Sequence, residues 1–235
     1  MQWISLIPMR AGSKGLPNKN IIALAGKPLY KHSVDVALAA GARKVYISTD
    51  IQKVFTERMN KRVEVVKRKR TLCTDDAHIN SVISDFLKFG VGSKIRDSEI
   101  LVLMQPTSPI RDIKDLKHAV KKFSETTRVD LLMSVTPNDS SILKSGLLED
   151  GYFKPISSPQ YTFENRQKLP QVYKPNGSFY IFRAGWFREN KSFVTNSILA
   201  YEVLGERSVD IDCLEDIQRA ELILKGDRST IDENF

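Results

Sequence analysis

The chain has 235 residues, and its 36 Lys and Arg outnumber its 28 Asp and Glu to give a net charge of +8. This length suits one α/β domain, so we expect a single domain over residues 1–235. The sequence holds no span of about 20 apolar residues, and Cys73 and Cys213 lack the spacing of a disulfide or zinc framework, so we expect a soluble, cytoplasmic protein with no membrane partner. The basic run at 65–70 has no interleaved aromatic residue, so we expect no nucleic acid partner.

Apolar runs and helical periods alternate along most of the chain. Short apolar runs predict strands at 3–9, 44–50, 62–68, 99–105 and 129–135. Amphipathic periods predict helices at 28–41, 51–60, 79–90 and 112–125, with Pro28 and Asp112 at helix starts. The run at 99–105 is apolar on both faces, as a central parallel strand is. The pattern predicts a three-layer α/β/α fold with a mostly parallel sheet.

This alternation breaks at about residue 136. Residues 137–175 are rich in Pro, Ser, Asn and Gly with short aromatic runs, and we expect an inserted arm that packs on another surface, such as a second subunit. A strand is predicted at 178–183 and a closing amphipathic helix at 212–226. Residues 227–235 are predicted to be a frayed polar tail.

The stretch "RAGSKGLPNKN" (10–20) directly follows the first predicted strand. Its glycines allow a close backbone approach, and successive N–H groups in such a turn can hold an anion. Arg10, Ser13, Lys14 and Lys19 add cationic and hydroxyl groups that suit a polyphosphate. The stretch is neither a Walker loop nor a dinucleotide-binding loop, and the alternative is a surface turn with solvated charges.

A second candidate is "DIDCLED" (210–216). Asp210 and Asp212 lie two apart in an extended segment, so their carboxylates share one side. Two adjacent carboxylates repel unless a proton or a cation lies between them, and Mg²⁺ binds one or two carboxylates together with substrate phosphates. The alternative is that one Asp caps the following helix while Glu215 and Asp216 complement its dipole.

The stretch "MQPTSPIR" (104–111) follows the central strand, where an α/β sheet binds its ligand. Gln105, Thr107 and Ser108 offer neutral donors and acceptors between two prolines, and Arg111 lies beyond. Ordinary turn chemistry is the alternative.

Taken together, "IPMRAGSKGLPNKN", "STD", "LMQPTSPIR", "RQKLPQVYKPNGSFYIF" and "DIDCLEDIQRAE" resemble the acylneuraminate cytidylyltransferases, the CMP-sialic acid synthetases, over nearly the whole chain. The resemblance implies the Rossmann-like fold of the nucleotide-diphospho-sugar transferases and a homodimer that exchanges its arm at 137–175. It also implies the magnesium-dependent reaction of CTP with a nine-carbon 2-keto acid sugar, of the neuraminic, legionaminic or pseudaminic type, to give the CMP-sugar and pyrophosphate.

The resemblance also implies roles for individual residues. Catalytic roles fall on Arg10, Lys14, Lys19 and Asp212, and magnesium ligation on Asp210 and Asp212. Nucleotide contacts fall on Arg10, Ser13, Lys14, Lys19, Asn20 and Arg68. Sugar contacts fall on Gln105, Thr107, Ser108, Arg166 and Gln167, with Arg166 and Gln167 reaching a neighbouring site. Met9 and Lys69 depart from the family pattern, Met9 at the nucleotide pocket and Lys69 next to Arg68. His78 and Ile79 stand where the family often has small hydroxyl residues, so the choice of sugar substituents is not carried over.

Two other functions remain open from the sequence. One is a nucleotidyltransferase of the same fold that uses another sugar or nucleotide. The other is a non-catalytic nucleotide- or RNA-binding protein, which the Asp pair argues against because two acidic groups repel a phosphate unless a metal is present. For the transfer reaction, a metal-bound water and Asp212 itself are both candidates for the base that removes the sugar hydroxyl proton.

Overall fold

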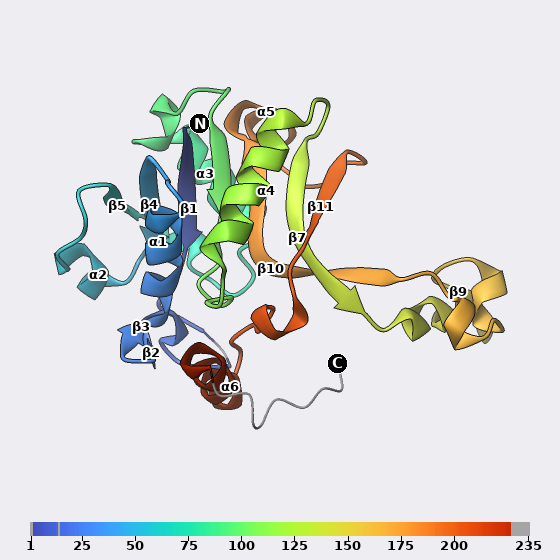
Figure 1. Ribbon diagram of the computed structural model, residues 1–235. Coiled ribbons are helices and arrows are strands. Elements are labelled where there is room, and N and C mark those ends of the chain that lie inside the picture. Colours follow the sequence, from blue (N-terminus) through green and yellow to red (C-terminus); the bar gives the residue numbers. More distant parts are fainter. Residues whose placement is uncertain (1, 14, 227–235) are drawn as a thin grey trace.

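A computed structural model describes residues 2–13 and 15–226, which fold around one seven-stranded sheet (Figure 1). Its strand order is β11-β7-β10-β6-β1-β4-β5, and every neighbouring pair is parallel except the two that β10 forms with β6 and β7. The strand bounds, in that order, are Ile198–Glu202, Leu131–Asn138, Val172–Arg183, Ile100–Leu103, Trp3–Pro8, Lys44–Thr49 and Val63–Lys67. The predicted mostly parallel sheet is therefore confirmed.

Helices cover both faces of this sheet. Helices α1 (Leu29–Ala39) and α4 (Ile113–Glu125) pack on the face in front in Figure 1, while α3 (Ile79–Lys88) and α5 (Ala184–Asn190) pack behind it. The three-layer arrangement was thus predicted correctly. Among the described residues, no helix has both the length and the hydrophobicity needed to cross a membrane.

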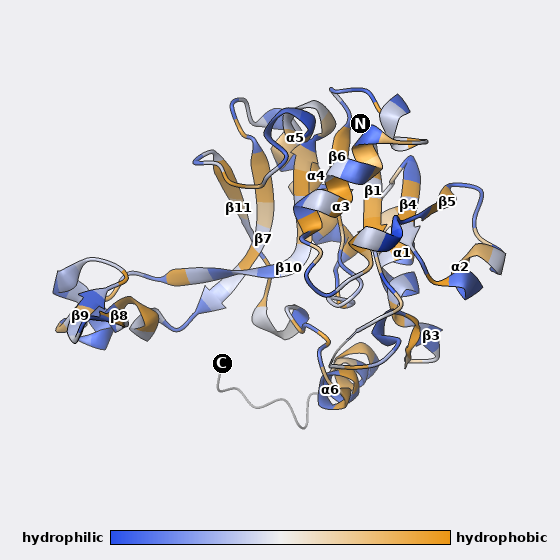
Figure 2. Cartoon of the chain, turned by 180° about the vertical axis from the view of Figure 1, so that it is seen from behind, coloured by the Kyte–Doolittle hydropathy of each residue, from blue (hydrophilic) through white to orange (hydrophobic). Residues whose placement is uncertain are grey.

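The central strands are buried on both sides. In β1, Trp3 and Ile7 join the core beneath α1 and α4, whereas Ile4 and Leu6 join the core beneath α3 and α5. The same alternation divides β6, and Figure 2 shows both strands in largely hydrophobic colours. An uninterrupted apolar run thus supplies two cores at once, which is the property of a central parallel strand.

A third apolar cluster lies below the sheet, next to α6 (Leu214–Lys225) and the short hairpin of β2 (Ala23–Leu24) and β3 (Lys27–Pro28). It unites residues from both ends of the chain: Leu16, Leu24, Leu29, Ile110, Val209, Ile211, Ile217 and Ala220. The basic turn (residues 10–20) and the acidic segment (residues 210–216) are therefore both anchored in this apolar cluster.

Several elements differ from those predicted. The helix expected at 51–60 is only α2 (Gln52–Thr56), because its one buried side chain is Val54 and the chain becomes extended at Glu57. Sequence reasoning did not predict α5 or β11. Strand β11 alternates exposed and half-buried residues at the edge of the sheet, and its apolar run covers only residues 198–201.

The segment 137–175 also begins and ends differently from the prediction. Strands β7 and β10 extend into it and pair with each other from Val172↔Asn138 to Pro175↔Val135. The ribbon projects from the body and carries a hairpin of β8 (Gly146–Glu149) and β9 (Tyr152–Pro155) near its tip (Figure 1). Apolar side chains on the projection are exposed, with Leu148 at 77% and Phe163 at 91%. The base of the arm is thus an extension of β7 and β10, and the role of the arm in dimer formation stays a prediction.

The aromatic cluster around Phe182 gives a stability prediction. Phe182 is fully buried, with ring centroids of Phe187 and Phe193 at 5.2 and 5.1 Å. Phe182→Ala is expected to lower the free energy of unfolding by about 3–5 kcal/mol, because a large cavity replaces the ring. Phe55→Ala, at a position 38% exposed, serves as the control and should cost about 1 kcal/mol. Urea unfolding measures both, and equal losses would contradict the assigned core.

Candidate functional site

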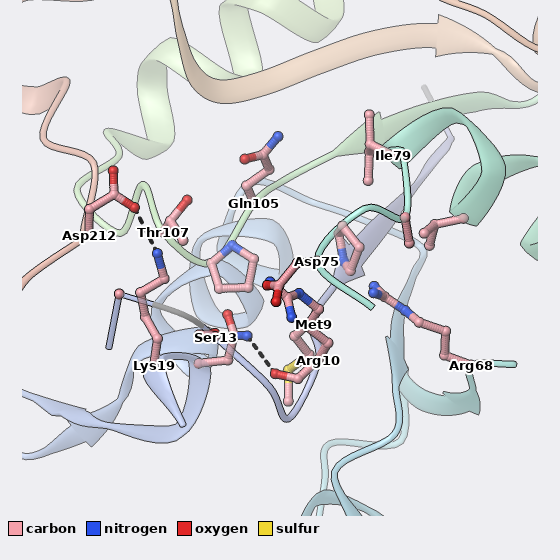
Figure 3. Close-up of a pocket in the computed structure, with 16 residues that line it drawn as sticks. Met9, Arg10, Ser13, Lys19, Arg68, Asp75, Ile79, Gln105, Thr107 and Asp212 are labelled. Carbon is pink, nitrogen blue, oxygen red and sulfur yellow. Dashed lines mark hydrogen bonds and ion pairs between the residues drawn. The ribbon is translucent and has the colours of Figure 1, made fainter. Parts of the chain in front are cut away.

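A cavity of about 420 Å³ opens beyond the carboxyl ends of β1 and β6 (Figure 3). Parallel α/β sheets bind ligands at this edge. The cavity brings together eight of the residues predicted from the sequence: Arg10, Ser13, Lys19, Asn20, Arg68, Gln105, Thr107 and Asp212. Stretches separated by as many as 200 residues thus share one site.

The basic turn is fixed by hydrogen bonds at its start. The backbone N–H of Ala11 donates to Asp50 Oδ1 at 2.8 Å, and the buried Asn20 donates its side-chain N–H to the Arg10 carbonyl at 3.0 Å. Arg10 itself forms an ion pair with Asp75. These contacts hold the turn open toward the cavity (Figure 3). Lys14, also predicted for this site, lies outside the described residues.

Lys19 and Asp212 connect the two ends of the chain inside the cavity. Lys19 Nζ lies 2.8 Å from Asp212 Oδ1, and the Lys19 side chain is only 14% exposed while that of Asp212 is 78% exposed. A Cβ atom added to Gly15 would lie 3.0 Å from the Asp212 carbonyl oxygen, so a larger residue there would press on this segment. The basic turn and the acidic segment are therefore in direct contact.

Asp212 is not the cap of the last helix. The Asp216 carboxylate accepts the backbone N–H groups of both Asp212 and Cys213 at 2.8 Å. Burial acts to raise the pKa of Asp216, but these hydrogen bonds lower it overall. The N-cap of α6 is Cys213, and Asp216 at the third helical position accepts its backbone N–H in a capping box, while the Asp212 carboxylate points to Lys19 and the cavity.

Asp210 and Asp212 are both exposed, and Ile211 between them is fully buried. That the two carboxylates share one side stays a prediction. Among the described residues that line the cavity, Asp212 is present and Asp210 is absent. The charge of Asp210 acts on Arg111, whose pKa it raises against the effect of burial. The described residues contain no group of three or more His, Cys, Asp or Glu that could hold a metal ion. A cation here would need further ligand atoms from a bound substrate.

Arg68 is a buried cation in the cavity wall. It is 7% exposed and donates from Nη2 to the Ser48 carbonyl at 3.3 Å, while its Nε has no hydrogen-bond partner among the described residues. Burial lowers the pKa of the Arg68 guanidinium, and the nearby Cys73 and Asp50 partly offset this. The protein alone thus satisfies this side chain poorly, as expected of a group that awaits an anionic ligand.

The three polar residues predicted after the central strand have different positions. Gln105 and Thr107 line the cavity, and the Thr107 carbonyl accepts the Ile211 N–H at 2.7 Å. Ser108 is 1% exposed and lies behind the wall, where its hydroxyl donates to the Asn176 carbonyl at 3.4 Å. Within this one chain, Ser108 supports the site from behind.

Arg166 and Gln167 lie on the arm, where they line a recess of about 520 Å³ near the end of β7. Arg166 Nη2 is 3.3 Å from Asp139 Oδ1, and both side chains are largely exposed. One chain therefore does not bring them into the cavity.

The cavity also contains residues that sequence reasoning missed as site residues. Asp75 pairs with Arg10, and the apolar Ala77, Ile79 and Val82 form part of the wall. Asp75 ends the "RKRTLCTD" stretch that follows β5. Because β5 is parallel to β4, the loop that follows β5 begins at the same edge of the sheet as the cavity. The order of the strands was therefore the signal that could have placed Asp75 in the site.

Comparisons with known proteins agree with this geometry. Residues 4–222 match the family model described as Cytidylyltransferase. The N-acylneuraminate cytidylyltransferase of Streptococcus agalactiae serotype III is 33% identical over 227 residues, which are 92% of this chain and 52% of that protein. This chain thus spans about half the length of that relative. The CMP-N,N'-diacetyllegionaminic acid synthase of Legionella pneumophila is 34% identical over 90% of this chain and 91% of that protein.

A solved structure shares the fold. It is the CMP:2-keto-3-deoxy-manno-octonic acid synthetase complexed with CTP, with a TM-score of 0.67 and 16% identity over 96% of this chain and 98% of that one.

Arg68 gives a prediction that separates stability from binding. In Arg68→Met, the free energy of unfolding of the free protein is expected to stay unchanged or to rise by about 1 kcal/mol, because a poorly partnered buried cation is removed. Any rise in melting temperature that added CTP causes in the unaltered protein should be lost. Arg62→Met, which removes a guanidinium bonded to the Ala42 carbonyl at 3.0 Å, is the control and should keep this rise. A full CTP effect in Arg68→Met would contradict the assignment.

Proposed function

We propose that this chain, which belongs to the cytidylyltransferase family, transfers CMP from CTP to a nine-carbon 2-keto acid sugar of the neuraminic, legionaminic or pseudaminic type and releases pyrophosphate. The observation that carries the proposal is the contact between Lys19 and Asp212 in one cavity, because it joins a basic turn to an acidic segment where a triphosphate would meet both. The names of the related proteins support the sugar class.

The nucleotide is proposed to lie along the basic turn. Arg10 and Lys19, together with Lys14, would neutralise the triphosphate oxygens, while Ser13 and Asn20 would position it by hydrogen bonds. Arg68, buried with an unpartnered Nε, would gain an anionic or polar partner from the nucleotide. The turn contains glycines so that backbone N–H groups can approach the phosphates.

Asp210 and Asp212 are proposed to hold Mg²⁺. The donor set fits in kind, because carboxylate oxygens are the ligands that Mg²⁺ prefers, both residues are exposed, and Asp212 already contacts a cation, the Lys19 ammonium. Bound there together with substrate phosphates, the ion would supply electrostatic stabilisation of charge on the transferring phosphate and on departing pyrophosphate. The protein's own part is positioning: the basic turn aligns the α-phosphorus so that the sugar hydroxyl attacks it and the bond to pyrophosphate breaks.

The sugar is proposed to lie on the side of Gln105 and Thr107, with Ser108 supporting this wall. Arg166 and Gln167 would complete the site from a second subunit in a homodimer that exchanges arms. The exposed apolar side chains of the arm support this arrangement, since an isolated surface of that kind favours burial against a partner.

A substrate panel tests the activity. Pyrophosphate release is measured with CTP, UTP, GTP and ATP against neuraminic, legionaminic and pseudaminic acids, and only CTP with one or more of these sugars should react. Asp212→Asn is expected to lower the rate by about 10²-fold or more, because charge on the phosphates is left without its cation. Asp150→Asn, in an exposed turn of the arm with φ 52°, is the control and should react normally. Near-normal turnover by Asp212→Asn would refute its role.

A mixing experiment tests the exchanged arm. Arg166→Ala and Asp212→Asn should each be nearly inactive, because each removes a group from every site. When the two are unfolded together and refolded, mixed dimers contain one site with both groups intact, so part of the activity should return. Light scattering measures the dimer. Activity that stays absent in proven mixed dimers would show that Arg166 acts within its own subunit, and an Arg166→Ala variant that is active by itself would show that Arg166 has no role.

A further inference from the structure

Arg111 uses all three nitrogens of its guanidinium to join three elements. Nε donates to the Ser178 carbonyl at 2.7 Å, Nη1 to the Ser33 hydroxyl at 2.8 Å, and Nη2 to the Gln105 carbonyl at 2.6 Å. Ser178 belongs to β10, Ser33 to α1, and Gln105 to the loop after β6. The planar guanidinium is suited to hold several acceptors in a fixed geometry.

These bonds lie directly behind the cavity wall. Gln105 is itself a wall residue, and Ser178 lies where the pairing of β10 with β7 shifts between Pro175 and Tyr180. A Cβ atom on Gly177, where φ is 72°, would lie 3.1 Å from Ser108 Oγ, so β10 and the 105–108 loop are tightly packed here. Arg111 therefore links β10 and α1 to the 105–108 loop, which carries Gln105 and Thr107.

Keeping the Arg111 guanidinium charged at this position costs free energy. Burial lowers the pKa of the Arg111 guanidinium, and Asp210 offsets only part of that effect. Apolar residues can replace a buried charge at little loss of stability in many proteins, so stability alone does not account for an arginine here. Fixed orientation of the loop does account for it.

We propose that Arg111 is a positioning residue that orients Gln105 and Thr107 toward the acceptor sugar. This inference rests on the proposed function, and it concerns the sugar alone. The basic turn has its own anchors in Asp50 and Asn20, so CTP binding does not depend on Arg111.

The test compares Arg111→Lys and Arg111→Met with a matched arginine. Arg188 also donates to two backbone carbonyls, those of Gly92 and Ile95, but before the amino end of β6, at the opposite edge of the sheet. Both Arg111 variants are expected to lower kcat/KM for the sugar by about tenfold or more through misorientation, while the CTP dissociation constant from calorimetry changes less than about threefold. Arg188→Lys should leave both quantities unchanged, and added guanidinium ion should partly restore Arg111→Met.

Each outcome decides the inference. If the Arg111 variants weaken CTP binding as much as they lower kcat/KM for the sugar, or if they change neither quantity, the inference is overturned. Should these variants fail to fold, Ser33→Ala removes one of the three bonds and decides instead: a several-fold rise in sugar KM with unchanged CTP binding supports the inference, and no change overturns it. A wild-type protein inactive toward every sugar overturns the proposed function and this inference with it, whereas an active wild type with unaffected variants overturns the inference alone.

Discussion

The site depends on the apolar cluster that joins the two ends of the chain. Leu16 from the basic turn and Ile211 from the acidic segment are buried in the same cluster, together with Ile110 from the loop after the central strand. Burial of such side chains stabilises the fold by roughly 1.5–3 kcal/mol each, which is more than an exposed ion pair provides. The contact between Lys19 and Asp212 is therefore a consequence of apolar packing beneath it, and the charges are brought together by hydrophobic surface.

Two cations of the cavity, unlike Arg68, are already paired with carboxylates before any ligand binds. Arg10 is paired with Asp75 and Lys19 with Asp212, so the cavity gathers cations without strong mutual repulsion. A ligand that carries negative phosphates, and brings a cation with it, can exchange these internal pairs for its own. Such an exchange needs little rearrangement of the backbone, because the turn is held by separate hydrogen bonds to Asp50 and from Asn20.

Much of the fold could be predicted from the sequence, because the strands of the inner sheet are unbroken apolar runs with helical periods between them. The gathering of Arg10, Lys19 and Gln105 was also predictable, since turns after parallel strands meet at one edge. The place of Asp212 beside them was expected only from the family resemblance, because no strand was predicted directly before it. Asp75 and the support role of Ser108 were not, because both depend on side-chain packing between distant segments. The true start of β10 was hidden by Asn176 and Gly177, because this pair is typical of a turn although the strand begins before it and continues past it.

The strands of the projecting ribbon also belong to the sheet. Both β7 and β10 continue into it, although their pairing shifts between Pro175 and Tyr180, and β10 lies between β6 and β7 there. Its direction therefore depends on how β10 is paired with β6 and β7, and the same strand that forms the ribbon also forms part of the sheet beside the cavity. The geometry of the projection and that of the sheet are thus coupled through one strand.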